Sequence, residues 1–182
     1  PIGVVGAVTA WNVPFFLAIL KVAPALASGC TIVLKAAPET PLNAYLLAEA
    51  AHAVGLPPGV LNVLAAGVES SEALVTHPGI DKVAFTGSTA VGKRIAGLAS
   101  PHLKRLTLEL GGKAAAIVLD DVDLAATIPQ LIAVSMTLSG QFCTAQSRIL
   151  VSSDRYDAAV EIYAGIAASL PVGNTFDKGT FI

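Results

Sequence analysis

The sequence predicts an α/β fold in which helices cover both faces of a parallel sheet. Short apolar runs rich in β-branched residues alternate with longer runs rich in Ala and Leu, as strands and helices alternate in parallel sheets. Of the 182 residues, 54% are hydrophobic and 13% are charged. That is enough apolar material for the buried cores of one or two small domains.

The first part of the chain is expected to contain five strands and four helices. The strands are predicted at residues 2–8, 31–35, 60–65, 82–86 and 105–110. The helices are predicted at residues 15–27, 41–54, 70–75 and 88–99. Gly29 and Gly55 lie where left-handed helix ends would fall, and Ser88 can cap the fourth helix. Thr40 followed by Pro41 predicts an N-cap and a first turn for the second helix.

After Gly111 and Gly112 the alternation starts again and indicates a second unit. Its strands are predicted at residues 115–119 and 148–151, and its helices at residues 124–138 and 154–169. We therefore expect two domains, residues 1–109 and 110–182, and a ligand site in the crevice between them, where such sites are common.

Charge and polar residues exclude several classes of partner. The formal net charge is -2 and the Lys and Arg residues are scattered, so nucleic acid is not expected to bind. The charge-free stretches 1–20 and 124–147 contain Pro and polar side chains that lipid would leave unsatisfied, so no membrane association is expected. The two cysteines lack C-x-x-C spacing and the three histidines are isolated, which predicts no metal site and a reducing, cytoplasmic location.

A loop rich in glycine and hydroxyl groups, residues 85–93, lies between a predicted strand and a predicted helix. Backbone N–H groups and the helix dipole favour a phosphate there, which makes Gly87 and Ser88 candidate nucleotide ligands. The spacing matches a P-loop until Arg94 takes the place of the Ser or Thr that would hold magnesium. A plain strand-to-helix turn is the alternative interpretation.

Cys143 and Glu109 are the candidate catalytic residues. Cys143 follows an apolar helix in a predicted turn, where a thiol can be exposed and reactive, although a lone cysteine is often a small buried hydrophobic residue. Glu109 lies in an otherwise apolar strand, where burial would raise its pKa and suit it to general-base catalysis. A carboxylate that faces solvent at the end of the strand is the alternative.

Polar side chains follow the first two predicted strands. Asn12, after Trp11, could donate to an oxyanion or cap the following helix. Lys35 and Glu39 flank the turn after the second strand. They could reach ribose hydroxyls or remain solvated charges.

Together these segments resemble the aldehyde dehydrogenase superfamily over essentially the whole chain. The resemblance rests on five motifs in order: residues 1–6 with Trp11-Asn12-Val13-Pro14, residues 23–35, Phe85-Thr86-Gly87-Ser88-Thr89, residues 108–113, and Gly140-Gln141-Phe142-Cys143. It implies that the chain is an internal piece holding most of a Rossmann-like NAD(P)-binding domain and the start of a catalytic domain.

By this resemblance Cys143 attacks an aldehyde, Asn12 and the Cys143 backbone N–H hold the oxyanion, and Glu109 activates the water that releases the acid. Lys21 matches a lysine near the active site. The implied cofactor is NAD, with NADP possible. The residues implied in binding it are Trp11, Lys35, Glu39, Gly87, Ser88, Leu110 and Gly111. The full-length protein is expected to be a homodimer or homotetramer.

One departure from the family pattern leaves the choice between NAD and NADP open. Pro38 stands where many members have the acid that grips the ribose 2′-hydroxyl, and the acid here is Glu39. A dehydrogenase that passes the acyl group to coenzyme A is disfavoured by Glu109, and an ATP-binding P-loop protein by Arg94. A nucleotide-binding module without activity is the third alternative.

Overall fold

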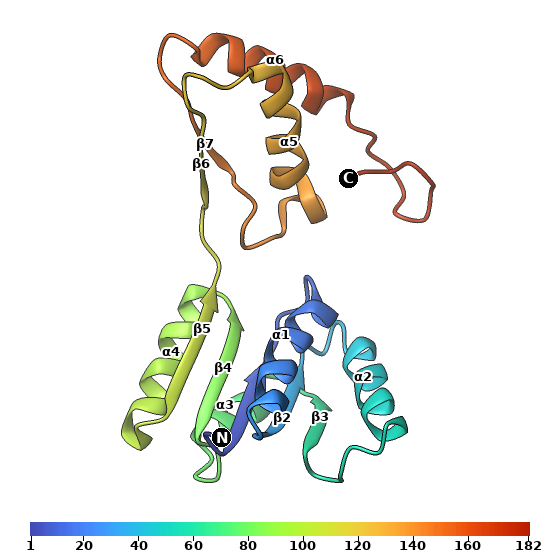
Figure 1. Cartoon of the computed structure of the whole chain (residues 1–182), viewed down its shortest axis with the longest axis vertical. Coiled ribbons are helices and arrows are strands. Elements are labelled where there is room, and N and C mark those ends of the chain that lie inside the picture. The colour runs from blue at the N-terminus through green and yellow to red at the C-terminus, as the bar shows by residue number, and fades with distance from the viewer. The chain divides into compact units, whose positions relative to one another are not determined.

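The structure is a computed structural model that describes residues 1–182. The chain divides into two compact units, Pro1–Leu110 and Gly111–Ile182, each with its own sheet and helices (Figure 1). No helix is long and apolar enough to cross a membrane.

The first unit is a five-stranded parallel sheet with helices between its strands, which confirms the predicted α/β class. The strands are β1 (Val4–Val8), β2 (Thr31–Ala36), β3 (Leu61–Ala65), β4 (Lys82–Gly87) and β5 (Arg105–Leu110). The helices are α1 (Pro14–Ala27), α2 (Leu42–Ala53), α3 (Val68–Thr76) and α4 (Thr89–Ala99), and a short 3-10 turn, η1 (Ser100–His102), follows α4.

The strand order β3-β2-β1-β4-β5 places β1 at the centre of the sheet. The chain runs from β1 outward through β2 to β3, then crosses back to place β4 on the other side of β1. Helices α1 and α2 pack on one face, where Ala18 and Ala44 belong to the same core cluster as Ile32 and Leu34. Helices α3 and α4 supply Val75 and Ile95 to the core on the opposite face (Figure 1).

Most predicted helix boundaries are confirmed. Gly29 and Gly55 have φ values of 73° and 75° and follow the last turns of α1 and α2, as left-handed C-cap positions require. The Ser88 hydroxyl accepts a hydrogen bond of 3.3 Å from the Val91 N–H and caps α4. The capping prediction for Thr40 was wrong, because its hydroxyl donates to the Trp11 carbonyl and Pro41 takes the N-cap position.

The second unit contains a two-stranded parallel sheet, β6 (Ala115–Ile117) and β7 (Arg148–Leu150). Its helices are α5 (Leu124–Met136) and α6 (Tyr156–Ser169), with the short 3-10 turn η2 (Thr137–Gly140) after α5. Ile128, Ile132 and Ala159 from these helices form a separate core with Val118. Helix α5 ends before the predicted residue 138, because Thr137 leaves the helical conformation with ψ 133° and Leu138 follows with φ 53°.

Candidate functional site

A pocket of about 450 Å³ opens in the first unit at the carboxyl ends of the central strands. Its walls come from the segments that follow β1, β2 and β4 and from the facing sides of α3 and α4. The chain reverses its direction across the sheet between β1 and β4, and ligands of open α/β sheets bind at such switch points. Five predicted cofactor residues line this pocket: Trp11, Lys35, Glu39, Gly87 and Ser88.

Lys35 places a cation inside the pocket. It is the fifth residue of β2 and pairs with Val8 of β1, so its side chain lies on the α3 and α4 face and is only 6% exposed. Burial lowers the pKa of Lys35, and the negative charge of Glu39 acts in the opposite direction. A buried ammonium group beside a carboxylate suits the recognition of polar groups on a nucleotide.

The turn from β4 to α4 provides a place for a phosphate. Gly87 ends β4 and Ser88 caps the eleven-residue helix α4. Because the Ser88 oxygen accepts from Val91, its own O–H remains a donor toward a ligand. The positive end of the α4 dipole adds to this preference for an anion.

The two other predicted cofactor residues lie outside the pocket lining. The Leu110 side chain packs against α4, so close that a Cβ added at Gly92 would lie 2.6 Å from its Cδ2 atom. Gly111 begins the second unit.

Lys21, Thr86 and Glu109 come together on the opposite face of the sheet. The Lys21 Nζ atom donates to Thr86 Oγ1 at 2.6 Å, and Thr86 pairs with Glu109 in the β4–β5 register. Burial lowers the pKa of Lys21, while the negative charge of Glu109 raises it. Thr86 was not among the predicted site residues, although a polar side chain in an apolar strand could have indicated it.

Of the two interpretations of Glu109, the carboxylate that faces solvent is the one found in the first unit, and burial is not. Residues alternate along the edge strand β5, so Leu106, Leu108 and Leu110 pack toward α4 while Glu109 and its neighbours Arg105 and Thr107 are exposed on the other face. Glu109 therefore lies on the exposed face of β5, where its charge acts on Lys21.

Replacing Lys21 with Met is expected to remove a rise in the free energy of unfolding that the wild type shows as the pH becomes alkaline. The lowered pKa of Lys21 means that, between this value and 10.5, the unfolded chain binds a proton that the folded chain does not. Wild-type stability should therefore gain up to about 1.4 kcal/mol per pH unit in this window relative to Lys21→Met. Urea unfolding of both proteins over a pH series measures the difference.

Lys93→Met, at an exposed position of α4, is the matched control and should show no such trend. A stability gap between wild type and Lys21→Met that stays constant as pH rises toward 10.5 would contradict the burial argument.

Asn12 and Trp11 lie in the segment between β1 and α1. Trp11 is 47% exposed, and Asn12 is half-buried. The N-cap position of α1 belongs to Val13, without a side-chain hydrogen bond. Asn12 therefore lies one residue before the N-cap position of α1.

Cys143 is an exposed thiol in a turn of the second unit, as predicted from its position after an apolar helix. Three residues just before it have positive φ: Leu138, Ser139 and Gly140. For the two non-glycine residues this conformation costs roughly 1–2 kcal/mol each. Such strain is typical of turns that present a functional side chain.

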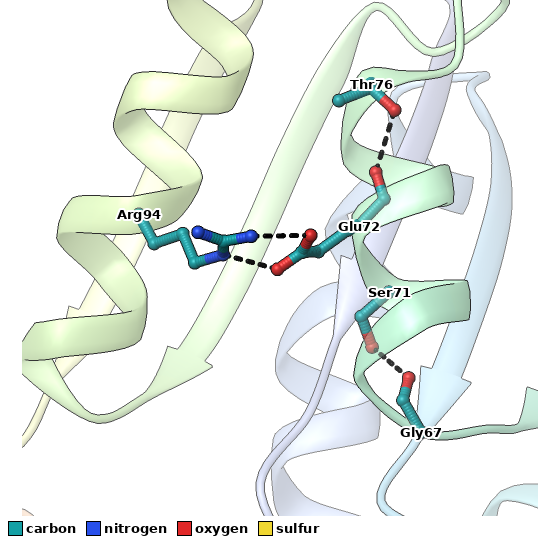
Figure 2. A network of polar contacts seen from close by, with 5 residues as sticks. All are labelled: Gly67, Ser71, Glu72, Thr76 and Arg94. Carbon is teal, nitrogen blue, oxygen red and sulfur yellow. Dashed lines mark hydrogen bonds and ion pairs between the residues drawn. The ribbon is translucent and has the colours of Figure 1, made fainter.

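An ion pair that the sequence did not indicate crosses the pocket wall. The Arg94 guanidinium of α4 binds the Glu72 carboxylate of α3 through two hydrogen bonds, one from Nε and one of 2.8 Å from Nη2 (Figure 2). Both residues line the pocket. The orientation of α3 relative to α4 depends on how both helices pack on the strand that connects them. The Glu72–Arg94 ion pair could therefore not be predicted from residue spacing.

Comparison with known proteins assigns this arrangement to one family. The aldehyde dehydrogenase family model matches residues 1–182. A geranial dehydrogenase of Castellaniella defragrans is 49% identical over 182 residues, which are 100% of this chain and 38% of that protein. A mitochondrial succinate-semialdehyde dehydrogenase of Arabidopsis thaliana is 46% identical over 99% of this chain and 34% of its own length. The chain thus spans little more than a third of these relatives.

Solved structures agree with this result. An aldehyde dehydrogenase of Mycobacterium tuberculosis complexed with NAD+ superposes with a TM-score of 0.95 and 53% identity, over 99% of this chain and 37% of that one. An aldehyde dehydrogenase mutant of Pseudomonas syringae, in complex with NAD+ and octanal, gives a TM-score of 0.95 and 40% identity over 100% of this chain and 38% of that one.

Proposed function

Because the chain belongs to the aldehyde dehydrogenase family, we propose that the protein oxidises an aldehyde to a carboxylic acid with NAD+ or NADP+ as the oxidant. The observation that carries the proposal is the pocket at the switch point of the sheet, where Lys35 and Ser88 converge. We assign nucleotide binding to residues 1–109 and the start of the catalytic domain to residues 110–182.

The pocket fits the adenosine and phosphate groups of a dinucleotide. The buried Lys35 and the neighbouring Glu39 offer a donor and an acceptor to ribose hydroxyls. Ser88 and the first turn of α4 would hold the pyrophosphate. Trp11 lines the same cavity. When bound, NAD+ supplies the capacity to accept a hydride from the substrate.

The proposed chemistry begins at Cys143. Its thiolate forms a bond to the aldehyde carbon, and the carbonyl π electrons move to the oxygen. The Asn12 amide and the Cys143 backbone N–H stabilise this oxyanion by hydrogen bonds. After loss of the hydride the acyl group remains on Cys143 as a thioester.

Glu109 then acts as the general base. It takes a proton from water, whose oxygen bonds to the thioester carbon, and the C–S bond breaks to return the Cys143 thiolate and release the acid. Lys21 would orient Glu109 through the attraction between their charges, and Lys21 itself is fixed by its hydrogen bond to Thr86. Lys21 is thus a positioning residue in this scheme.

The full protein chain, mixed with a panel of aldehydes and either NAD+ or NADP+, is expected to reduce the nicotinamide, which absorbance measures directly. Chromatography should show the carboxylic acid in an amount equal to the reduced nicotinamide. This result distinguishes aldehyde oxidation from acyl transfer to coenzyme A. If no aldehyde gives reduced nicotinamide with either cofactor, the proposal fails and a binding module is the remaining alternative.

A reducing compartment suits a mechanism that depends on a thiolate, so we place the enzyme in the cytoplasm. For the full-length protein we propose a homodimer or homotetramer. Light scattering coupled to size-exclusion chromatography distinguishes these from a monomer.

A further inference from the structure

The facing sides of α3 and α4 form an apolar part of the pocket with one ion pair across it. Val68 and Val75 of α3 and Ile95 of α4 line this part, and Glu72 meets Arg94 between the two helices. Bidentate pairing of this kind fixes the plane and the direction of a guanidinium group. Arg94 is therefore held by Glu72 of α3.

Glu72 lies on α3, where two side-chain hydrogen bonds to backbone carbonyls stabilise the helix near it. The Ser71 hydroxyl donates to the Gly67 carbonyl at 2.9 Å, and the Thr76 hydroxyl donates to the Glu72 carbonyl at 2.9 Å (Figure 2). Hydrogen bonds from Arg94, together with its positive charge, lower the pKa of Glu72. The carboxylate therefore remains ionised and paired at neutral pH.

The charged side chains that line the pocket balance one another. The cations are Lys35 and Arg94, and the anions are Glu39 and Glu72. A 2′-phosphate would add about two negative charges at neutral pH, which this lining cannot neutralise. A ribose with a free 2′-hydroxyl brings no charge and meets no such cost.

We propose that Glu72 is a specificity-determining residue: by occupying Arg94 it makes the pocket select a dinucleotide with a free 2′-hydroxyl over one with a 2′-phosphate. The inference rests on the proposed cofactor site and decides between the two cofactors that the site could take. It assigns the choice to an ion pair between two helices, in addition to any contribution from Glu39. Removing the Glu72 charge releases a guanidinium group that can bind a phosphate by the same two-pronged geometry.

The test is calorimetric titration of the full protein chain with adenosine 2′,5′-bisphosphate and with ADP. Glu72→Gln should tighten binding of the 2′-phosphorylated probe about tenfold, as expected for one gained charge-assisted contact, and affect ADP binding far less. Arg94→Gln should weaken binding of the 2′-phosphorylated probe, because the Glu72 carboxylate is then uncompensated. The double variant should lose the gain of Glu72→Gln.

Glu69→Gln is the matched control, since Glu69 is an exposed residue of the same helix outside the pocket lining. An equal gain in this control, or a gain that persists in the double variant, would overturn the assignment to Arg94. ADP binding by the wild type with no gain in Glu72→Gln would overturn the inference and leave the proposed function standing. If the wild type binds neither probe nor NAD+, the cofactor site fails and the inference fails with it.

Discussion

Replacing Cys143 with Ala is expected to lower kcat for aldehyde oxidation by at least about a thousandfold. The variant lacks the sulfur that forms the covalent bond to the aldehyde carbon, and no other group in the proposed scheme can carry the acyl intermediate. Binding of NAD+ should be unchanged, because the residues assigned to the nucleotide belong mainly to the first unit. Steady-state kinetics and calorimetric titration with NAD+ measure the two properties separately.

Cys30→Ala is the matched control, since Cys30 is the only other cysteine and is 4% exposed. Its sulfur accepts a hydrogen bond from the Ile2 N–H, so some stability should be lost without loss of activity. Alkylation of the folded protein by iodoacetamide should modify Cys143 and stop turnover while Cys30 is protected. Retained oxidation in Cys143→Ala would remove this residue from the mechanism.

Glu109→Gln is expected to separate the two halves of the reaction. The first half does not require the carboxylate, so rapid mixing should give a burst of one reduced nicotinamide for each active site. Hydrolysis of the thioester then lacks its general base, and steady-state turnover should fall by about 10²–10⁴-fold. Added hydroxylamine should restore turnover, because it attacks the thioester without help from a carboxylate.

Glu49→Gln, which removes an exposed carboxylate from α2, is the control for the change in charge and should behave as the wild type. Loss of the burst itself in Glu109→Gln would contradict the assigned role, since the residue would then act before the thioester. An unaltered steady-state rate would exclude Glu109 as the base.

The strands and helices of the first unit were predictable because their apolar periodicity and their end signals agree. Gly29, Gly55 and Ser88 end or begin helices as their residue types predict. The errors lie where a local signal competes with backbone or tertiary constraints. Gly3, with φ 114°, delays β1 until Val4, and the Thr40 hydroxyl donates to the Trp11 carbonyl instead of capping α2.

The sequence allowed the individual residues of the candidate site to be predicted, but not the contacts between them. Lys35 and Ser88 line one pocket because parallel strands end at a common edge, which alternation alone implies. The Lys21–Thr86 hydrogen bond depends on how far α1 is rotated over the sheet. Exposure of Glu109 depends on β5 being an edge strand, and strand order is not encoded in any short stretch of sequence.

The central position of β1 has a consequence for how the first unit folds during synthesis. Of the five strands in this sheet β1 is synthesised first, yet one of its two neighbours, β4, ends only at Gly87. At about 5–20 residues per second, β1 spends several seconds with one side unpaired, and such long-range pairing also slows refolding. Chaperone binding or early aggregation should therefore involve the hydrophobic run of β1 more than the later strands, although β1 is paired on both sides once the sheet is complete.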